Sequence, residues 1–558
     1  MLKVPSHDRS EVESLANSLG VTRTAACVLL SRGLGQHESA ANYLTPRLAS
    51  LTPPGAMAGR EAAVSRLARA ARQHERTVIF GDYDADGITA TALLTEVMRI
   101  VGADVTPIVA NRFEGGYGLS AGALSRVRDA RPTLLVTCDC GSSDHDRLED
   151  ARRAGIEAVV IDHHRVPEAQ LPAVAFLNPH REDCGFAYKG LASVGLAFSV
   201  AAGVRAELGV DLDVRPWLDL VALGTVADVA PLDGDNRALV RAGLGVIAKG
   251  GREGTRALVE VAGCARSTPT GEDISFRLAP RINAPGRIDR AELALDLLLA
   301  TNAVDAQRLA ERVDACSTRR KEIERGVVSD ALAEIGDPPF SDLPAIVVAR
   351  QGWHQGVVGI VAGRLASMTG KPAIVVGLEG GVGRGSARGP AGFSVYDALV
   401  ACRDVLVAFG GHHAAAGLEV KADQVEALRD QFCAACATQK PATLPVPYDA
   451  EAHWVEGEAP DRVLRDFERF EPCGRANPAP RVGIERARVA EARAVRGGHM
   501  RLVLNLAGVR MACFGPDMGN RVDALRGAGE VDVVGAFVRN AWNGVESAEM
   551  RLVAANPS

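Results

Sequence analysis

The chain has 558 residues, too many for one hydrophobic core, so we expect three or four domains. Its 47% hydrophobic and 24% charged residues are typical of a soluble globular protein, and 4% aromatic residues exclude wide stacking surfaces. A net charge of −6 argues against nucleic acid wrapped over the whole surface, although a local basic groove is compatible with it. We see no signal peptide, no uncharged apolar stretch of about 18 residues, and eleven cysteines without framework spacing. We therefore expect a cytoplasmic protein with no membrane partner.

Residues 1–58 are predicted to form short helices, a lead-in without visible chemistry. Residues 59–238 alternate strand and helix, the pattern of a parallel sheet, with strands expected at 78–80, 105–109, 134–137 and 159–161. The working residues of such sheets lie at the carboxyl ends of the strands.

Three acids follow the first of these strands, in Asp82-Tyr83-Asp84-Ala85-Asp86-Gly87. In an extended chain, the i, i+2, i+4 spacing would place all three carboxylates on one face. Carboxylates so close repel one another unless a cation lies among them. A solvated Asp-rich turn is the alternative.

More acids and two histidines follow the later elements. Asp139 ends the third strand, Asp162-His163-His164 follows the fourth, and Asp228 follows a helix that begins after Trp217. Each alone could be a helix cap or turn residue. Together they favour a metal site, and carboxylates with one or two imidazoles suit Mn²⁺ or Mg²⁺. So many carboxylates imply two ions that share a bridging acid.

Residues 239–342 are predicted to be a helical connector, and 343–438 a second α/β unit. The connector contains an irregular break from Arg281 to Arg287 that carries two arginines. In the second unit, the glycine-rich stretch 383–389 offers backbone N–H groups, a hydroxyl and guanidinium groups to a phosphate. The stretch 410–417 places His412 and His413 where a ligand can approach the backbone. Structural loops and tight turns are the alternatives.

Residues 439–558 begin with a Pro-rich stretch and a turn at 471–478, and continue with short alternating strands such as 501–506 and 531–537. This pattern predicts a small β-barrel. Seven arginines and two glutamates lie between Pro480 and Met511, which suits a groove for single-stranded nucleic acid. A merely solvated face is the alternative.

These motifs, in this order and over nearly the whole chain, resemble those of the DHH-superfamily phosphodiesterases, and within them the RecJ family of bacterial exonucleases. The resemblance implies an α/β fold in which a DHH parallel-sheet domain is joined by a long helical arm to a DHHA1 domain, followed by an OB-like barrel. The segments that carry the resemblance are 82–87, 139–141, 162–164, 227–231, 281–287, 353–356, 410–417, 471–474 and 477–478.

The resemblance also implies a function: 5′→3′ hydrolysis of single-stranded DNA to 5′-mononucleotides with two Mn²⁺ or Mg²⁺ ions, in DNA repair and recombination. It implies a single-strand-binding protein and a RecQ-type helicase as further partners. His164 would lie beside the metals or on the substrate side, and Asp139 would bridge. The implied metal ligands are Asp82, Asp84, Asp86, Asp139, His163 and Asp228. The implied contacts to the 5′ phosphate or backbone are Arg112, Arg281, Arg287, Ser386, Arg388, His412 and His413.

Three other functions are weighed against this one. Another DHH-type enzyme, acting on cyclic dinucleotides, short oligonucleotides or pyrophosphate, is disfavoured by the length and the barrel. A non-enzymatic replication scaffold of the same fold would lack some of the acids. An ATP-driven helicase is excluded because Gly370-Lys371 is followed by Pro372, which leaves no P-loop.

Overall fold

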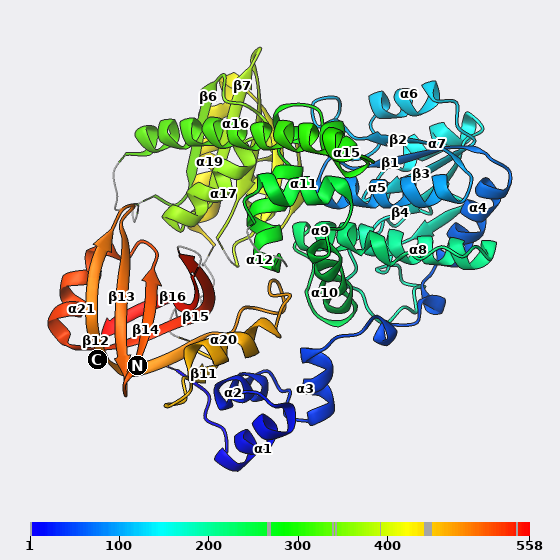
Figure 1. Cartoon of the computed structure of the whole chain (residues 1–558). Helices are drawn as coiled ribbons and strands as arrows, with labels where there is room; N and C mark the ends of the chain where they lie inside the picture. Colours follow the sequence, from blue (N-terminus) through cyan, green and yellow to red (C-terminus); the bar gives the residue numbers. More distant parts are fainter. Residues whose placement is uncertain are drawn as a thin grey trace.

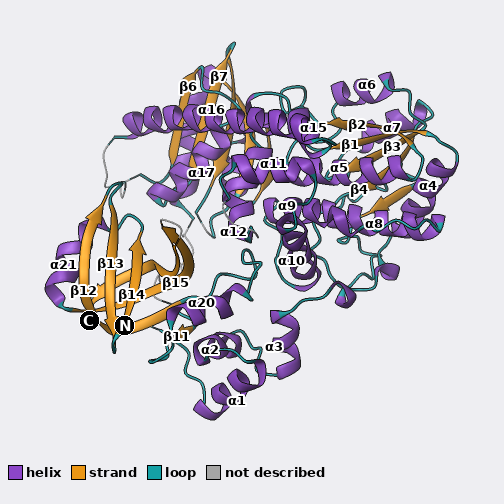
Figure 2. Cartoon of the chain, in the orientation of Figure 1, coloured by secondary structure: helices purple, strands orange, loops and turns teal. Residues whose placement is uncertain are grey.

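The computed structural model places three sheets along the chain, joined by helices (Figure 1). Helices flank the first two sheets, whereas the C-terminal unit is mostly strand (Figure 2). The structure describes residues 3–264, 269–336, 340, 343–390, 392–439, 449–542 and 545–558.

The first sheet is entirely parallel, with the order β2-β1-β3-β4-β5. The four predicted strands are confirmed. The strand order changes direction between β1 and β3, and ligands of open α/β sheets bind at such a switch point. The strands are β1 (Arg76–Gly81), β2 (Asp104–Val109), β3 (Leu134–Cys138), β4 (Glu157–Ile161) and β5 (Ala175–Leu177).

Helices cover both faces of this sheet because its strands are apolar on both sides. Ile79 packs into one cluster, whereas its neighbours Val78 and Phe80 pack into another. The first cluster is covered by α4 (Arg60–Arg72), α5 (Ala85–Ile100), α8 (Ser193–Leu208), α9 (Leu218–Ala227) and α10 (Gly234–Ala248). The second is covered by α6 (Ala121–Asp129) and α7 (His145–Arg153).

The predicted helical connector is confirmed, and its longest helix, α16 (Ala303–Ile335), joins two cores. Val313 of α16 lies in the core of the first sheet, and Val327 lies in a cluster under the second. The expected irregular break at 281–287 is instead mostly helical. The remaining helices are α11 (Glu253–Val261), α12 (Gly271–Asp273), a π-helical turn (Ile274–Leu278), α13 (Ala279–Ile282), α14 (Pro285–Ile288) and α15 (Glu292–Leu298).

The second sheet has the order β6-β7-β8-β10-β9, with β6 and β7 parallel and the other pairs antiparallel. Both glycine-rich stretches are built into this sheet, as β8 and the β9–β10 hairpin, and only the second contains the tight turn that was the alternative to ligand contact. A side chain at Gly383 would come within 2.6 Å of Val376, so the sheet's own packing requires glycine there. The elements are β6 (Ile346–Gln351), β7 (Ala373–Glu379), β8 (Val382–Arg388), β9 (Leu406–His412), β10 (Ala415–Lys421), α17 (Val358–Thr369), α18 (Val395–Ala401) and α19 (Val425–Ala437).

The predicted C-terminal barrel is confirmed. Five strands follow one another as β12-β13-β14-β16-β15, and pairing of β12 with β15 closes the ring. These strands are longer than the sequence indicated. The elements are β11 (Ala452–His453), α20 (Pro460–Glu468), β12 (Val482–Val495), β13 (His499–Leu506), β14 (Val509–Gly515), α21 (Val522–Ala528), β15 (Glu530–Trp542) and β16 (Val545–Pro557).

The N-terminal helices pack against this C-terminal unit, which the sequence did not indicate. The helices α1 (Arg9–Leu19), α2 (Arg23–Ser31) and α3 (His37–Leu44) share a core with the barrel and α20, in which Leu29 and Phe470 are both fully buried. The backbone N–H of Thr22 donates to the carboxylate of Asp466 at 2.6 Å. The two ends of the chain therefore form one packed unit (Figure 1). Within the described residues, no helix is long and apolar enough to span a membrane.

Candidate active site

The first acidic motif forms the turn from β1 into α5. Asp84 is the N-cap of α5, and its carboxylate accepts from the backbone N–H groups of Asp86 at 3.0 Å and Gly87 at 3.2 Å. The expected extended arrangement of the three acids is therefore wrong, because the helix already begins at Ala85. A side chain at Gly87 would lie 2.6 Å from the backbone of Asp82, so glycine permits the close turn that gathers the acids.

The other acids and histidines approach this turn from three directions. Asp139 follows β3 in a left-handed conformation with φ +62°, and His163 and His164 follow β4. Asp228 is the C-cap of α9, so it comes from the end of a helix and not of a strand. Asp139 is buried, and its position at the β1–β3 switch point brings it next to the acids that follow β1.

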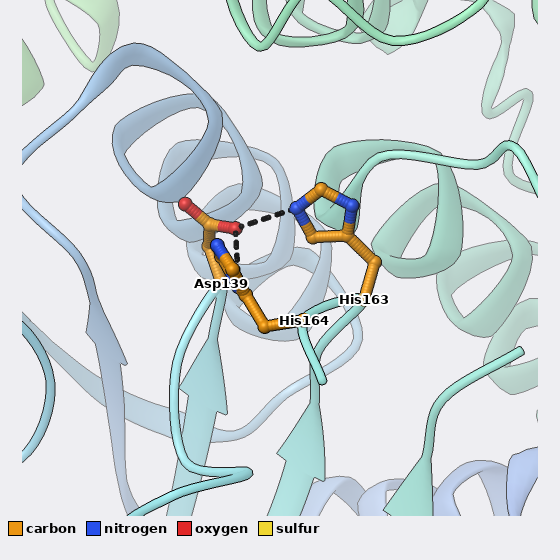
Figure 3. A group of neighbouring side chains, drawn as sticks. All are labelled: Asp139, His163 and His164. Carbon is orange, nitrogen blue, oxygen red and sulfur yellow. Dashed lines mark ion pairs between the residues drawn. The ribbon is translucent and has the colours of Figure 1, made fainter. Parts of the chain in front are cut away.

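The histidines converge on Asp139 (Figure 3). His163 Nε2 lies 3.2 Å from Asp139 Oδ1, and His164 Nδ1 lies 3.7 Å from the same oxygen. His163 Nε2 also lies 3.8 Å from Asp228 Oδ2 and 3.9 Å from Asp86 Oδ2. One imidazole nitrogen is thus surrounded by carboxylates of three elements.

These side chains suit divalent cations. Buried His163 Nε2 has no hydrogen-bond partner among the described residues, so it is free to donate its lone pair to a metal. Ligand atoms lie within 4.8 Å of one another in three groups: Asp82 with Asp84 and Asp139, Asp86 with His163 and Asp228, and Asp139 with His163 and His164. Asp139 and His163 each belong to two groups, and of the two only the Asp139 carboxylate offers two oxygens with which to bridge two ions. Carboxylate oxygens with few imidazoles favour Mn²⁺ or Mg²⁺.

The carboxylates of this cluster resist ionisation in the absence of a cation. Burial, followed by the charges of neighbouring acids, raises the pKa of Asp86 to about 7 and that of Asp228 to about 8. The same two causes raise the pKa values of Asp82 and Asp139 well above the usual range. A bound cation would remove this penalty, so the cluster has a strong electrostatic preference for positive charge.

The two adjacent histidines have opposite electrostatic environments. Burial, together with the charge of His164, lowers the pKa of His163 to about 4, so His163 is neutral, as a metal ligand must be. Burial also disfavours the His164 cation, but the hydrogen bond from its Nδ1 to Asp162 Oδ1, 2.8 Å long, outweighs it and raises the pKa of His164 to about 9. In the metal-free protein, His164 therefore carries a positive charge at neutral pH.

Several supporting residues were not predicted. The N–H groups of Ser193 and Val194, at the start of α8, donate to the Asp86 carboxylate at 2.7 and 2.9 Å. The Ser193 hydroxyl donates to Asp139 at 3.1 Å, and the Tyr117 hydroxyl donates to the Asp139 carbonyl at 2.9 Å. Tyr117 lies between glycines, which is the only local signal that could have found it.

A cleft of about 770 Å³ lies beside the cluster, between the first and second sheets. Four arginines line it. Arg384 pairs with Glu419, whereas the other three form no ion pair within the described parts of the chain: Arg112, Arg287 and Arg388. Arg112 stacks on the ring of Tyr83 at 4.1 Å, and its Nε is buried without a partner in the same described parts. Burial and the neighbouring Arg112 lower the pKa of Arg287 to about 10. Because no ion pair among the described residues neutralises these arginines directly, their charge favours an anion in the cleft.

Only some of the predicted substrate contacts line this cleft. Ser386 lines the cleft with Arg388, and its Oγ accepts from Arg388 Nη1 at 2.6 Å. Arg281 instead forms an ion pair with Asp314 at 2.7 Å and does not line the cleft. His412 and His413 are exposed at the turn of the β9–β10 hairpin, outside the lining. For these three residues, a contact with substrate stays a prediction.

Comparison with known families gives three matches along the chain. Residues 76–225 match the DHH family N-terminal domain, residues 342–438 match the DHHA1 domain, and residues 456–554 match the RecJ OB domain.

The similar proteins and the solved structure described next all carry the name RecJ. The single-stranded-DNA-specific exonuclease RecJ of Bacillus subtilis is 32% identical over 552 residues, which are 98% of this chain and 69% of that protein. The protein of the same name from Thermus thermophilus is 34% identical over 96% of this chain and 75% of its own length. A crystal structure of Thermus thermophilus RecJ in complex with Mn²⁺ superposes with a TM-score of 0.84 at 32% identity, covering 100% of this chain and 78% of that one. With this similarity over its full length, the chain belongs to the RecJ family of DHH phosphodiesterases.

Proposed function

We propose that this protein is a metal-dependent exonuclease that degrades single-stranded DNA from the 5′ end to 5′-mononucleotides, in DNA repair and recombination. The proposal rests on one observation: the candidate metal ligands lie next to a cleft that contains arginines. A cluster of metal ligands lies at the switch point of the first sheet, and beside it a cleft holds three arginines without ion pairs. A terminal phosphate in that cleft would place the next phosphodiester at the metals.

Two Mn²⁺ or Mg²⁺ ions would activate a water molecule and stabilise negative charge on the phosphoryl oxygens. Asp139 would bridge the ions, since it belongs to two of the ligand groups and its carboxylate, unlike the imidazole of His163, offers two oxygens. The proposed ligands are Asp82, Asp84, Asp86, Asp139, His163 and Asp228.

The other predicted site residues would stabilise negative charge on the phosphate or position the substrate. His164 is cationic because of Asp162, so we assign it to the phosphoryl oxygens on the substrate side of the cluster. Arg112, Arg287, Arg388 and Ser386 would bind the 5′ phosphate.

The barrel would guide the single strand toward the cleft. We further propose a single-strand-binding protein and a RecQ-type helicase as partners, and the cytoplasm as the location. We propose the domain division 1–58, 59–238, 239–342, 343–438 and 439–558.

The test is digestion of a 3′-labelled, 5′-phosphorylated single strand beside its duplex, in Mn²⁺ and in EDTA. The expected result is a ladder that shortens from the 5′ end, on the single strand only and only with metal. Turnover of dinucleotides or cyclic dinucleotides without cleavage of the long strand would instead indicate a different phosphodiesterase.

A further inference from the structure

The turn at 471–478 is a conspicuous sequence motif that the proposed mechanism does not use. It follows α20 and reaches the ends of α9 and α10 in the first α/β unit (Figure 1). We propose that Arg475, at the tip of this turn, is a substrate-binding residue that holds a backbone phosphate on the 3′ side of the scissile bond, where the strand passes from the barrel to the metal cluster. This inference rests on the proposed function.

The tip of the turn is a rigid two-residue hairpin. Gly474 and Asn477 exchange backbone hydrogen bonds of 2.8 and 3.2 Å, which leaves Arg475 and Ala476 at the end. Ala476 has a left-handed φ of +62°. A residue at such a tip is held in place by the backbone and needs little reorganisation to bind a ligand.

Buried polar contacts fix the base of the hairpin. The side-chain amide of Asn477, which is 4% exposed, donates to the carbonyls of Phe470 at 3.0 Å and Pro472 at 2.6 Å. Its oxygen accepts from Arg32 at 2.8 Å and from the Tyr43 hydroxyl at 2.7 Å. The N-terminal helices therefore have a role here, since they supply two of the groups that hold the hairpin.

The tip lies directly beside a predicted metal ligand. The N–H of Leu232 donates to the carbonyl of Arg475 at 2.7 Å, and Arg475 Nη1 donates to the carbonyl of Val229 at 3.3 Å. Val229 is the residue after Asp228 and has φ +57°, so the hairpin contacts the strained turn that carries this ligand. Arg475 is exposed, and the Val229 contact is its only side-chain hydrogen bond in the described structure, so most of its N–H groups can bind a ligand.

Positive charge therefore flanks the metal cluster at two ends. At the Asp82–Asp84 end, Arg112 stacks on Tyr83 and lines the cleft assigned to the 5′ phosphate. At the Asp228 end, Arg475 is delivered by the C-terminal unit. A strand whose 5′ end occupies the cleft must leave the metals in another direction, and the Arg475 end leads to the barrel. The two sites together would fix the polarity of the bound strand.

The proposal is tested by pairing a charge removed from the protein with a charge removed from the DNA. Single strands with one uncharged methylphosphonate at successive positions 3′ of the first phosphodiester are compared with the unmodified strand, using wild-type protein and the Arg475→Gln variant in Mn²⁺. We expect about a fivefold loss in kcat/KM for Arg475→Gln, seen mainly in KM. One methylphosphonate position should cost the wild type a similar factor and cost the variant nothing further.

Binding to the unmodified strand in EDTA provides a second readout that does not need cleavage. The slope of log Kd against log salt should fall by about 0.7 in Arg475→Gln, because one phosphate contact is lost. Arg475→Lys should retain the slope. Arg153→Gln is the matched control, since it removes an exposed arginine charge at the C-terminal end of α7, at the opposite rim of the first sheet.

Three outcomes would overturn the proposal: no change for Arg475→Gln, an equal loss with Arg153→Gln, or a lowered kcat on every strand with an unchanged salt slope. The last would mean that Arg475 acts only through the Val229 turn. If the wild type binds the strand but does not cleave it, the proposed function fails, and the salt slope still decides the role of Arg475.

Discussion

The metal-free protein should be destabilised by its own carboxylates, and Asp228 is the residue that best tests this. Its pKa is raised from 3.8 to about 8, by burial first and then by the charges of Asp86 and Asp84. A pKa shift of this size means that the native environment disfavours the ionised carboxylate, relative to the protonated one, by roughly 5–6 kcal/mol. Because 24% of the side chain is exposed and Asp86 shares the repulsion, we expect Asp228→Asn to recover about 2 kcal/mol of the free energy of unfolding.

The sign of the pH dependence follows from the raised pKa. The native state holds the Asp228 proton up to about pH 8, whereas the unfolded chain releases it near 3.8, so stability falls as the pH rises through this window. In EDTA near pH 9, Asp228→Asn should therefore unfold about 4–8 °C above the wild type, by calorimetry. Near pH 5 the difference should shrink, because Asp228 is then protonated in the native wild type. In Mn²⁺ the order should reverse, because the variant lacks a metal ligand.

Asp211→Asn is the control, since Asp211 is exposed and belongs to none of the metal-ligand groups. It should change the unfolding temperature little at either pH. The reasoning is refuted if Asp228→Asn gains no stability near pH 9, or gains the same amount near pH 5. An unchanged response to Mn²⁺ would remove Asp228 from the metal site.

Three further substitutions test other parts of the site. Asp139→Ala should abolish hydrolysis and leave DNA binding largely intact, because the bridging ligand is lost; residual cleavage on a gel would contradict the two-ion site. Arg388→Gln should reduce the preference for 5′-phosphorylated over 5′-hydroxyl strands about tenfold in kcat/KM; an equal loss on both strands would place the 5′ phosphate elsewhere. Arg488→Glu, on β12, should weaken DNA binding more at low salt than at high salt, by fluorescence anisotropy; a salt-independent effect would argue against a basic groove on the barrel.

Much of the fold and the metal cluster could be predicted because their signals are local. An apolar run followed by an acid marks the carboxyl end of a strand, and parallel strands bring such ends to one rim. Asp82, Asp139 and His163 were placed together on this basis, and the structure gathers them. The arrangement of the acids at 82–86 was harder to predict from the sequence, because the N-cap role of Asp84 depends on where the helix begins.

Other features depend on contacts between distant segments. Whether a cation is free to bind substrate depends on its neighbours, and Arg281 meets Asp314 from α16, 33 residues further along the chain. The glycines of β8 resemble a phosphate-binding loop in sequence, but Gly383 is required by Val376 of the adjacent strand. The sequence contains no periodic or compositional pattern that would predict either contact, Arg281 with Asp314 or Gly383 with Val376.

The structure around Asp228 depends most on contacts between distant segments. Residues that are neither metal ligands nor substrate contacts therefore affect the site through the positions that they stabilise. Arg32, the C-cap of α2, and Tyr43 of α3 bind Asn477 at the base of the hairpin. Arg237, from α10 of the first α/β unit, donates to the carbonyls of Tyr43 at 3.0 Å and Phe470 at 2.9 Å. The N-terminal helices, the C-terminal unit and the first sheet are thus joined by a buried polar network a few residues from Asp228, a proposed metal ligand. Because buried polar groups are costly when left unpaired, these contacts hold the three units in one arrangement, and the hairpin can present Arg475 to the strand at a fixed position.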